Sequence, residues 1–111
     1  MQTITKSPEE TKDSILNNTE WLSSWYQKEC NGDWEHTYGI SIQTLDNPGW
    51  SVQIDLHDTS LENLEILPDA KQISDSDWYV IKIKDKKFIA VGDSTKLDFL
   101  IGKFRELVVQ S

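Results

Sequence analysis

Residues 34–56 read WEHTYGISIQTLDNPGWSVQIDL, and this stretch decides the fold. Between positions 34 and 45 the apolar and aromatic residues recur at even numbers, the period of two that is typical of a strand with one buried face. Between positions 50 and 56, Trp, Val, Ile and Leu again occupy the even numbers, with Ser, Gln and Asp between them. We therefore expect two strands that pair as a β-hairpin.

The loop of this hairpin can be tested by parity. In an antiparallel pair the numbers of opposed residues sum to a constant, so a core face of even positions in both strands requires a loop with an odd number of residues. A loop of three or five residues within positions 46–50 satisfies this condition. Pro48 followed by Gly49 suits the centre of a type II turn, because Pro fixes a negative φ and Gly accepts a positive one.

Helical patterns lie on both sides of the strand-rich middle. From Ser14 to about Glu29 the apolar residues have helical spacing, and Asn31-Gly32 supplies a stop. Near the C-terminus, Gly92-Asp93-Ser94 offers an N-cap to a second helix. Its broad apolar stripe comprises Leu97, Leu100, Ile101, Phe104, Leu107 and Val108.

A second hairpin is expected from residues 78–84 and 88–91, joined by Asp85-Lys86-Lys87. Its Lys residues lie on the outer face and in the turn. The segment between the hairpins is ambiguous: Thr59 and Glu62 resemble a capping box, whereas LEIL at positions 64–67 fits an edge strand before Pro68. We expect an irregular segment with a short edge strand.

These elements define the fold class α+β, with an antiparallel sheet of four to five strands and the N- and C-terminal helices packed on one face. A length of 111 residues with 37% hydrophobic content suits one domain. We place this domain at residues 13–111. Residues 1–12 are polar and lack apolar periodicity, so we expect a flexible arm.

The formal net charge of −8 opposes binding to nucleic acid or to an anionic membrane surface and favours basic partners. No apolar run approaches the length of a membrane span, and the N-terminus lacks the apolar centre of a signal peptide. The single cysteine, Cys30, agrees with a reducing compartment. We expect a cytoplasmic protein.

The histidines do not predict a metal site. If even positions face the core, His36 points inward and His57 outward, so the two cannot share a metal ion. Glu35 and Asp55 fall on the exposed sheet face, where acids are ordinary, and the common catalytic signatures are absent. We therefore expect that the protein is not an enzyme and that it binds no cofactor and no metal ion.

The chain resembles the bacterial immunity protein 53 family over about residues 20–104. The motifs that carry the resemblance are WLSSWY at 21–26, GDWEH at 32–36, YGI at 38–40 and TLDNPGW at 44–50. The residues of this framework are Trp25, Trp34, His36, Tyr38, Asp46, Asn47, Pro48, Gly49 and Trp50. The segment LENLEILPDAKQ at 61–72 and the N-terminal arm depart from the family pattern, which affects the choice of partner.

The resemblance implies an immunity protein that binds and neutralises a cognate bacterial toxin domain by occluding its active site. Residues 55–77 hold seven acids against Lys71 alone, a local charge of −6. An acidic surface suits a basic toxin, such as a nuclease. The expected contact residues are Glu35, Gln43, Gln53, Asp55, His57, Asp58, Glu62, Glu65, Asp75 and Asp77.

An alternative from another class stays open. Glu35, His36 and Tyr38 could line a cleft beside the hairpin in a small ligand-binding or hydrolase-like domain. A solvent-accessible pocket that holds all three would favour it. The oligomeric state and the identity of the toxin do not follow from the sequence.

Overall fold

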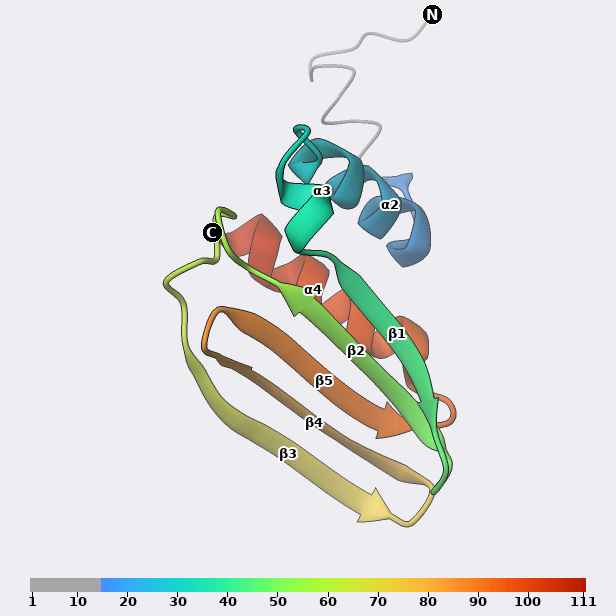
Figure 1. Ribbon diagram of the computed structural model, residues 1–111. Coiled ribbons are helices and arrows are strands. Elements are labelled where there is room, and N and C mark those ends of the chain that lie inside the picture. Colours follow the sequence, from blue (N-terminus) through green and yellow to red (C-terminus); the bar gives the residue numbers. More distant parts are fainter. Residues whose placement is uncertain (1–14) are drawn as a thin grey trace, which may run out of the picture.

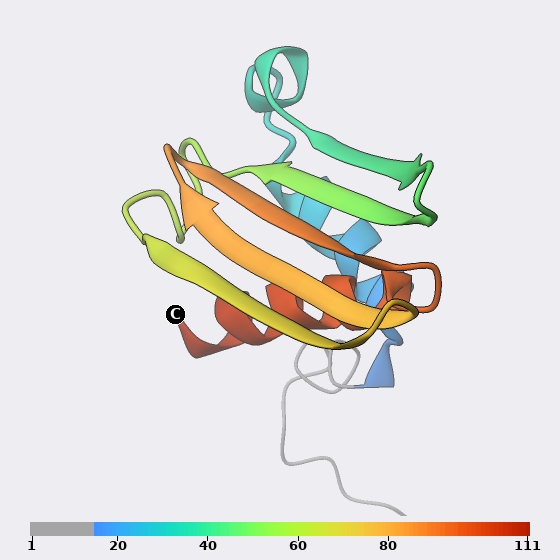
Figure 2. The ribbon, with the colours of Figure 1, turned by 90° about the horizontal axis from the view of Figure 1, so that it is seen from below.

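A five-stranded antiparallel sheet with two long helices on one face forms the fold in the computed structural model, which describes residues 15–111 (Figures 1 and 2). The expected arm at residues 1–12 lies outside the described residues. In chain order the elements are α2 (Asn18–Glu29), α3 (Trp34–Thr37), β1 (Ile40–Leu45), β2 (Gly49–Asp55), β3 (Ile66–Ser74), β4 (Asp77–Lys84), β5 (Lys87–Asp93) and α4 (Leu97–Gln110). The strand order is β1-β2-β5-β4-β3. The α+β prediction is confirmed.

The β1–β2 hairpin has the parity that the sequence requires. Its register runs from Ile40 opposite Ile54 to Leu45 opposite Gly49, so the loop contains three residues, 46–48. The even positions of β2 from Val52 onward are buried, and Gln53 between them is exposed. The type II turn, however, is wrong: the Asn47–Pro48 peptide bond is cis, and Gly49 already belongs to β2.

Residues 34–37 form the short helix α3 instead of the first half of a strand. The Asn31 side chain accepts hydrogen bonds from the backbone N–H groups of Asp33 and Trp34, at 2.9 and 3.0 Å. Such local bonds from side chain to backbone compete with strand pairing and favour a helical turn. As a result Trp34 is buried, as expected, but His36 is exposed, which corrects its inward placement.

The core lies between the sheet and the two long helices (Figure 2). Phe104 of α4 is fully buried, and its ring lies 4.9 Å from that of Trp25 and 5.1 Å from that of Phe88. Trp25 and Trp34 meet edge to face, with centroids 6.0 Å apart. Aromatic rings from both helices and the sheet therefore fix how α2, α3 and α4 cover the sheet.

The segment between the hairpins differs from the expectation in two ways. Residues 57–63 form consecutive turns, and Thr59 does not build a capping box with Glu62; its hydroxyl donates to the Leu56 carbonyl oxygen at 2.8 Å. The edge strand is longer than expected, because β3 runs for nine residues with a register shift on either side of residues 69–72. It pairs with β4 and forms one margin of the sheet.

The second hairpin is confirmed, with a tighter turn. Lys84 pairs with Lys87, so only Asp85 and Lys86 lie in the turn, and both have positive φ, at 55° and 60°. Two left-handed residues match the right-handed twist of the strands they join. Ile81 and Ile83 are buried, and Lys84 is exposed.

Gly49 is required where the start of β2 pairs with the end of β5. A Cβ at this position would overlap the carbonyl oxygen of Gly92, a backbone atom that cannot rotate away. We expect Gly49→Ala to lower the free energy of unfolding by about 2–3 kcal/mol, measured by urea denaturation. Gly39→Ala is the matched control, because no atom lies within 4 Å of its Cβ and a change within about 0.5 kcal/mol is expected. Equal losses in the two variants would contradict the steric account.

Candidate functional site

The outer face of the β1–β2 hairpin carries two of the expected contact residues as the sequence placed them. Gln43 lies opposite Ser51, and Gln53 lies opposite Ser41, on the sheet face away from the helices. Both glutamines are exposed, and the Gln43 amide donates to the Ser41 hydroxyl at 3.2 Å. These side chains are available to a partner and carry no charge.

Asp55 shares this face but has internal partners. Its carboxylate accepts the backbone N–H of Gly39 at 2.9 Å and forms an ion pair with Lys87 at 3.6 Å. It therefore ties the start of β1 to β2 and β5. Because Lys87 balances its charge, Asp55 adds less negative potential to the surface than its sequence position suggests.

Glu35 is not on the sheet, which corrects its expected place on the outer face. It lies on α3, where its carboxylate accepts the N–H groups of Asn31 at 3.0 Å and Gly32 at 2.9 Å. The bond from its own backbone N–H, followed by those from Asn31 and Gly32, holds the pKa of Glu35 below its usual value, although burial opposes the shift. Glu35 closes the loop between α2 and α3.

The two histidines lie in different surroundings. His36 is exposed on α3, whereas the His57 ring stacks on Tyr38 with centroids 4.5 Å apart and an angle of 7° between the rings. The His57 carbonyl oxygen accepts the Trp34 indole N–H at 2.8 Å. His57 thus anchors the end of β2, and its Nδ1 is buried without a hydrogen-bond partner among residues 15–111.

The remaining acids of the expected surface do not form one patch. Asp58, Glu62 and Glu65 precede β3, whereas Asp75 and Asp77 follow it. The two groups are separated by the length of a nine-residue strand, about 30 Å. Asp77 also has a partner within the fold, the Lys96 ammonium at 2.8 Å.

We call residues 58–65 the acidic loop. It contains three acids and no basic residue. Thr59 fixes its backbone from inside, because the hydroxyl accepts the Leu61 N–H at 3.2 Å and the Leu61 side chain is only 3% exposed. Asp58, which has a φ of 62°, and Glu65 are exposed, and Glu62 is half-buried. The loop is therefore a fixed backbone that presents negative charge.

The other half of the outer sheet face is basic. Lys82, Lys84 and Lys87, together with Asp85 and Ile89, line a shallow hollow of about 490 Å³ on β4 and β5. The sequence predicted lysines on this face. The sheet face as a whole is therefore not an acidic surface, and the acidic loop is separate from it in chemistry.

A polar cluster that the sequence analysis missed lies at the start of α4. Asp93 is 2% exposed and accepts the Thr95 N–H at 2.8 Å, the Trp78 N–H at 2.8 Å and the Lys96 ammonium at 2.7 Å. The signal Gly-Asp-Ser was interpreted as an N-cap, but α4 begins after Lys96 and Asp93 caps the preceding turn. Lys96 also pairs with Asp77, which lies 19 residues earlier in the chain, and this partner could not be assigned from the sequence.

This cluster makes stability depend on pH. Hydrogen bonds from Lys96 and then Thr95 hold the pKa of Asp93 well below its ordinary 3.8. The unfolded chain then binds this proton at a higher pH than the folded one, so the contribution is present above about pH 4 and is lost on acidification. We expect the stability difference between wild type and Asp93→Asn to narrow from pH 6 to pH 2, as measured by urea denaturation at each pH.

Asp46→Asn serves as the control for this pH series, since Asp46 lies exposed in the β1–β2 turn. Its difference from wild type should stay small and nearly constant. A difference for Asp93→Asn that is independent of pH would show that its carboxylate is not stabilised in the charged form.

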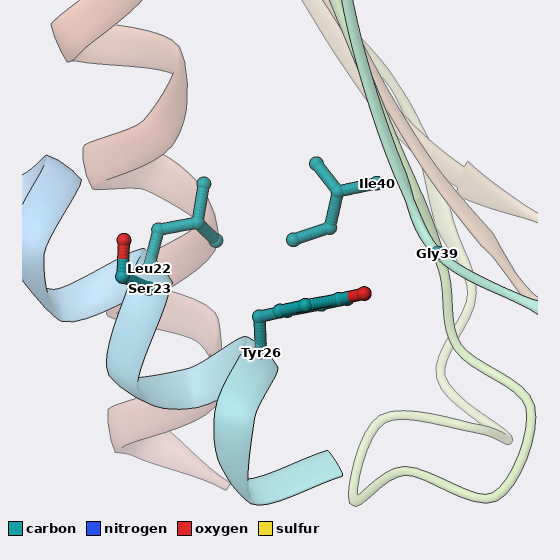
Figure 3. Close-up of a pocket in the computed structure, with 5 residues that line it drawn as sticks. All are labelled: Leu22, Ser23, Tyr26, Gly39 and Ile40. Carbon is teal, nitrogen blue, oxygen red and sulfur yellow. The ribbon is translucent and has the colours of Figure 1, made fainter. Parts of the chain in front are cut away.

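The Glu35, His36 and Tyr38 cleft of the alternative function is not assembled. Tyr38 lines a hollow of about 250 Å³ with Gln53, Asp55 and Lys87, and neither Glu35 nor His36 lines it. A second hollow, of about 310 Å³, lies between α2 and β1, where Leu22, Tyr26 and Ile40 point toward one another (Figure 3). Its lining is mainly apolar and lacks the acid–base pair that hydrolysis requires.

No three His, Cys, Asp or Glu side chains gather into a metal-binding group within residues 15–111. In the same part of the chain, no helix is long and apolar enough to cross a membrane.

The structure thus defines a small acidic α+β domain whose exposed, charged loops are suited to contact another macromolecule. The family model described as Immunity protein 53 matches residues 19–109, and the chain belongs to this family. Membership supports an immunity function and implies a toxin as the binding partner. No curated protein and no solved structure matches the chain.

Proposed function

We propose that this protein binds a cognate bacterial toxin domain in the cytoplasm of the producing cell and neutralises it, without catalysis, by covering its active site. Family membership over residues 19–109 is the observation that carries the proposal. The proposed toxin domain is basic, as a nuclease active site is, because the chain carries a net charge of −8.

The acidic loop is the centre of the proposed contact. Its three carboxylates have no ion-pair partner among residues 15–111, in contrast to Asp55 and Asp77. Leu64 adds an apolar side chain that is 37% exposed. Because the backbone is already fixed by Thr59 and Leu61, little conformational entropy is lost when a partner binds, which favours affinity.

Gln53 and Asp55 extend the proposed contact onto the adjoining sheet face. Both lie toward the end of β2, three to five residues before the acidic loop begins. Glu35 and His57 are positioning residues in this proposal, because their interactions hold the neighbouring loops. Asp75 and Asp77 lie beyond the far end of β3 and fall outside the proposed contact.

Co-expression tests the function. If the gene immediately upstream encodes a secreted protein with a variable C-terminal domain, that domain is the toxin candidate. We expect that domain alone to stop growth, and co-expression of this protein to restore it. Purified together, the two should form a complex that inhibits the toxin at equimolar ratio. Failure of rescue with both proteins folded would contradict the assignment for that pair.

A further inference from the structure

The outer edge of β3 is an unpaired strand edge. The strand has nine residues, and all of them except Ile66 are exposed. One edge pairs with β4, and β3 is the last strand of the sheet on this side (Figure 1). A long edge leaves backbone N–H and C=O groups free to pair with another strand.

The sequence of this edge, ILPDAKQIS, is self-complementary around Ala70. Asp69 and Lys71 flank the central residue with opposite charges. Leu67 and Ile73 lie three residues to either side and are 87% and 68% exposed. Neither charged side chain has an ion-pair partner among residues 15–111. Leu67 and Ile73 are thus exposed aliphatic side chains near the two ends of β3.

We propose that two copies of this chain associate through antiparallel pairing of β3 with β3, with the two-fold axis at Ala70. Asp69 of each copy then lies opposite Lys71 of the other, and Leu67 and Ile73 flank this paired centre on either side. The two five-stranded sheets become one continuous sheet. The helices of both copies lie on the same face, because residues of equal parity meet across the new edge.

The charges select this register. Within β3, Asp69 and Lys71 are opposite Ile81 and Tyr79 of β4, so both belong to the helix-covered face. Centring the pair on Asp69 would place the two Asp69 carboxylates opposite each other, and centring it on Lys71 would oppose the two ammonium groups. Like charges directly opposite each other destabilise a strand pair, whereas opposite charges stabilise it.

The occupant is a second copy because the charge complementarity lies within one strand: Asp69 and Lys71 match their own two-fold images. Pro68 lacks an N–H, and the register shifts on both sides of residues 69–72 limit regular pairing to the centre of the strand. The interface is therefore small, and we expect dissociation constants of about 10–500 µM.

Cross-linking at the axis tests the geometry. In a Cys30→Ser background, Ala70→Cys places two thiols on directly opposed residues, with Cα atoms about 4.5–5.5 Å apart, within the range of a disulfide. We expect mild oxidation at high protein concentration to give a covalent dimer. Gln72→Cys is the matched control on the same face, because its two copies would be about 13 Å apart along the strands, too far to bridge.

A charge swap tests the register by sedimentation equilibrium of the free protein. Asp69→Lys alone, or Lys71→Asp alone, turns two attractive pairs into two repulsive ones, and we expect the dissociation constant to rise about tenfold or more. The double variant Asp69→Lys/Lys71→Asp restores opposite charges across the axis. It should recover the wild-type dissociation constant.

The proposal is overturned if the wild type stays monomeric at millimolar concentration, or if Gln72→Cys cross-links as readily as Ala70→Cys. It is also overturned if the single charge variants do not change the dissociation constant of the dimer but abolish toxin binding. The edge of β3 would then be a contact surface for the toxin. All these measurements except the last use the protein alone, so they are independent of whether the proposed toxin is the right one.

Discussion

Replacing Glu62 and Glu65 with Lys should reduce the affinity for the cognate toxin domain by about 100-fold, mostly through slower association. Both carboxylates lie in the acidic loop, and neither has an ion-pair partner among residues 15–111. The change converts the local field from one that attracts a basic surface into one that repels it. Asp58 is left unchanged, because its φ of 62° favours Asp over Lys.

The measurement is a stopped-flow or surface-based association rate at several salt concentrations. Added salt should slow the association of wild type. It should not slow the association of the Glu62→Lys/Glu65→Lys variant and should instead raise it slightly, because salt screens long-range repulsion as well as attraction. Unfolding curves of the variant and of wild type check that the variant is folded, since surface substitutions usually change stability little.

Asp46→Lys/Asp75→Lys is the matched control. It produces the same change in net charge at two exposed turns, one at the β1–β2 loop and one at the β3–β4 loop. If the acidic loop is the contact, this control should retain affinity within about tenfold of wild type. An equal loss in both variants would mean that only the total charge of the protein matters, and the proposed contact would be wrong.

The parts of the fold that could be predicted are those in which local pattern and burial coincide. The β2 strand alternates because one face packs against the helices, so Val52 and Ile54 reveal it directly. The helix α4 shows its apolar stripe for the same reason. Odd loop length followed from parity alone, and the register of Ile40 with Ile54 confirms it.

The parts that could not be predicted depend on contacts that leave no periodic signal. Nearly all of β3 is exposed, so backbone pairing with β4 determines it and no apolar alternation marks its length. The Asp93 carboxylate accepts a hydrogen bond from the backbone N–H of Trp78, which is 15 residues away in the chain. The sequence predicted the negative charge of the candidate site but not its extent. The structure divides the acids into two groups, one on each side of β3.

Trp34 shows how a correct burial prediction can accompany a wrong element. Trp34, His36 and Tyr38 occupy alternate positions, which is the pattern of a strand. The Asn31 side chain nevertheless holds Trp34 in a helical turn. The ring is 3% exposed and packs against Trp25, Tyr26 and Tyr38, with centroids 6.0–6.2 Å away. Burial alone therefore did not distinguish the two elements, and the exposure of His36 did.

Trp34→Ala should lower the free energy of unfolding by about 3–5 kcal/mol, the range for truncation of a buried aromatic residue. The loss has two parts, the cavity left among three aromatic rings and the unpaired carbonyl oxygen of His57. Trp34→Phe keeps most of the ring and removes only the N–H donor, so it should cost about 1–2 kcal/mol. Urea denaturation followed by circular dichroism measures both.

His36→Ala is the control for this prediction, since His36 is exposed on the same short helix and should change stability by less than about 0.5 kcal/mol. A cost for His36→Ala similar to that for Trp34→Ala would restore the strand with His36 inward. Because the Trp34 indole holds the residue directly before the acidic loop, Trp34→Phe should also weaken toxin binding severalfold under conditions where it stays folded. Unchanged affinity in that variant would show that the loop keeps its position through Thr59 and Leu61 alone.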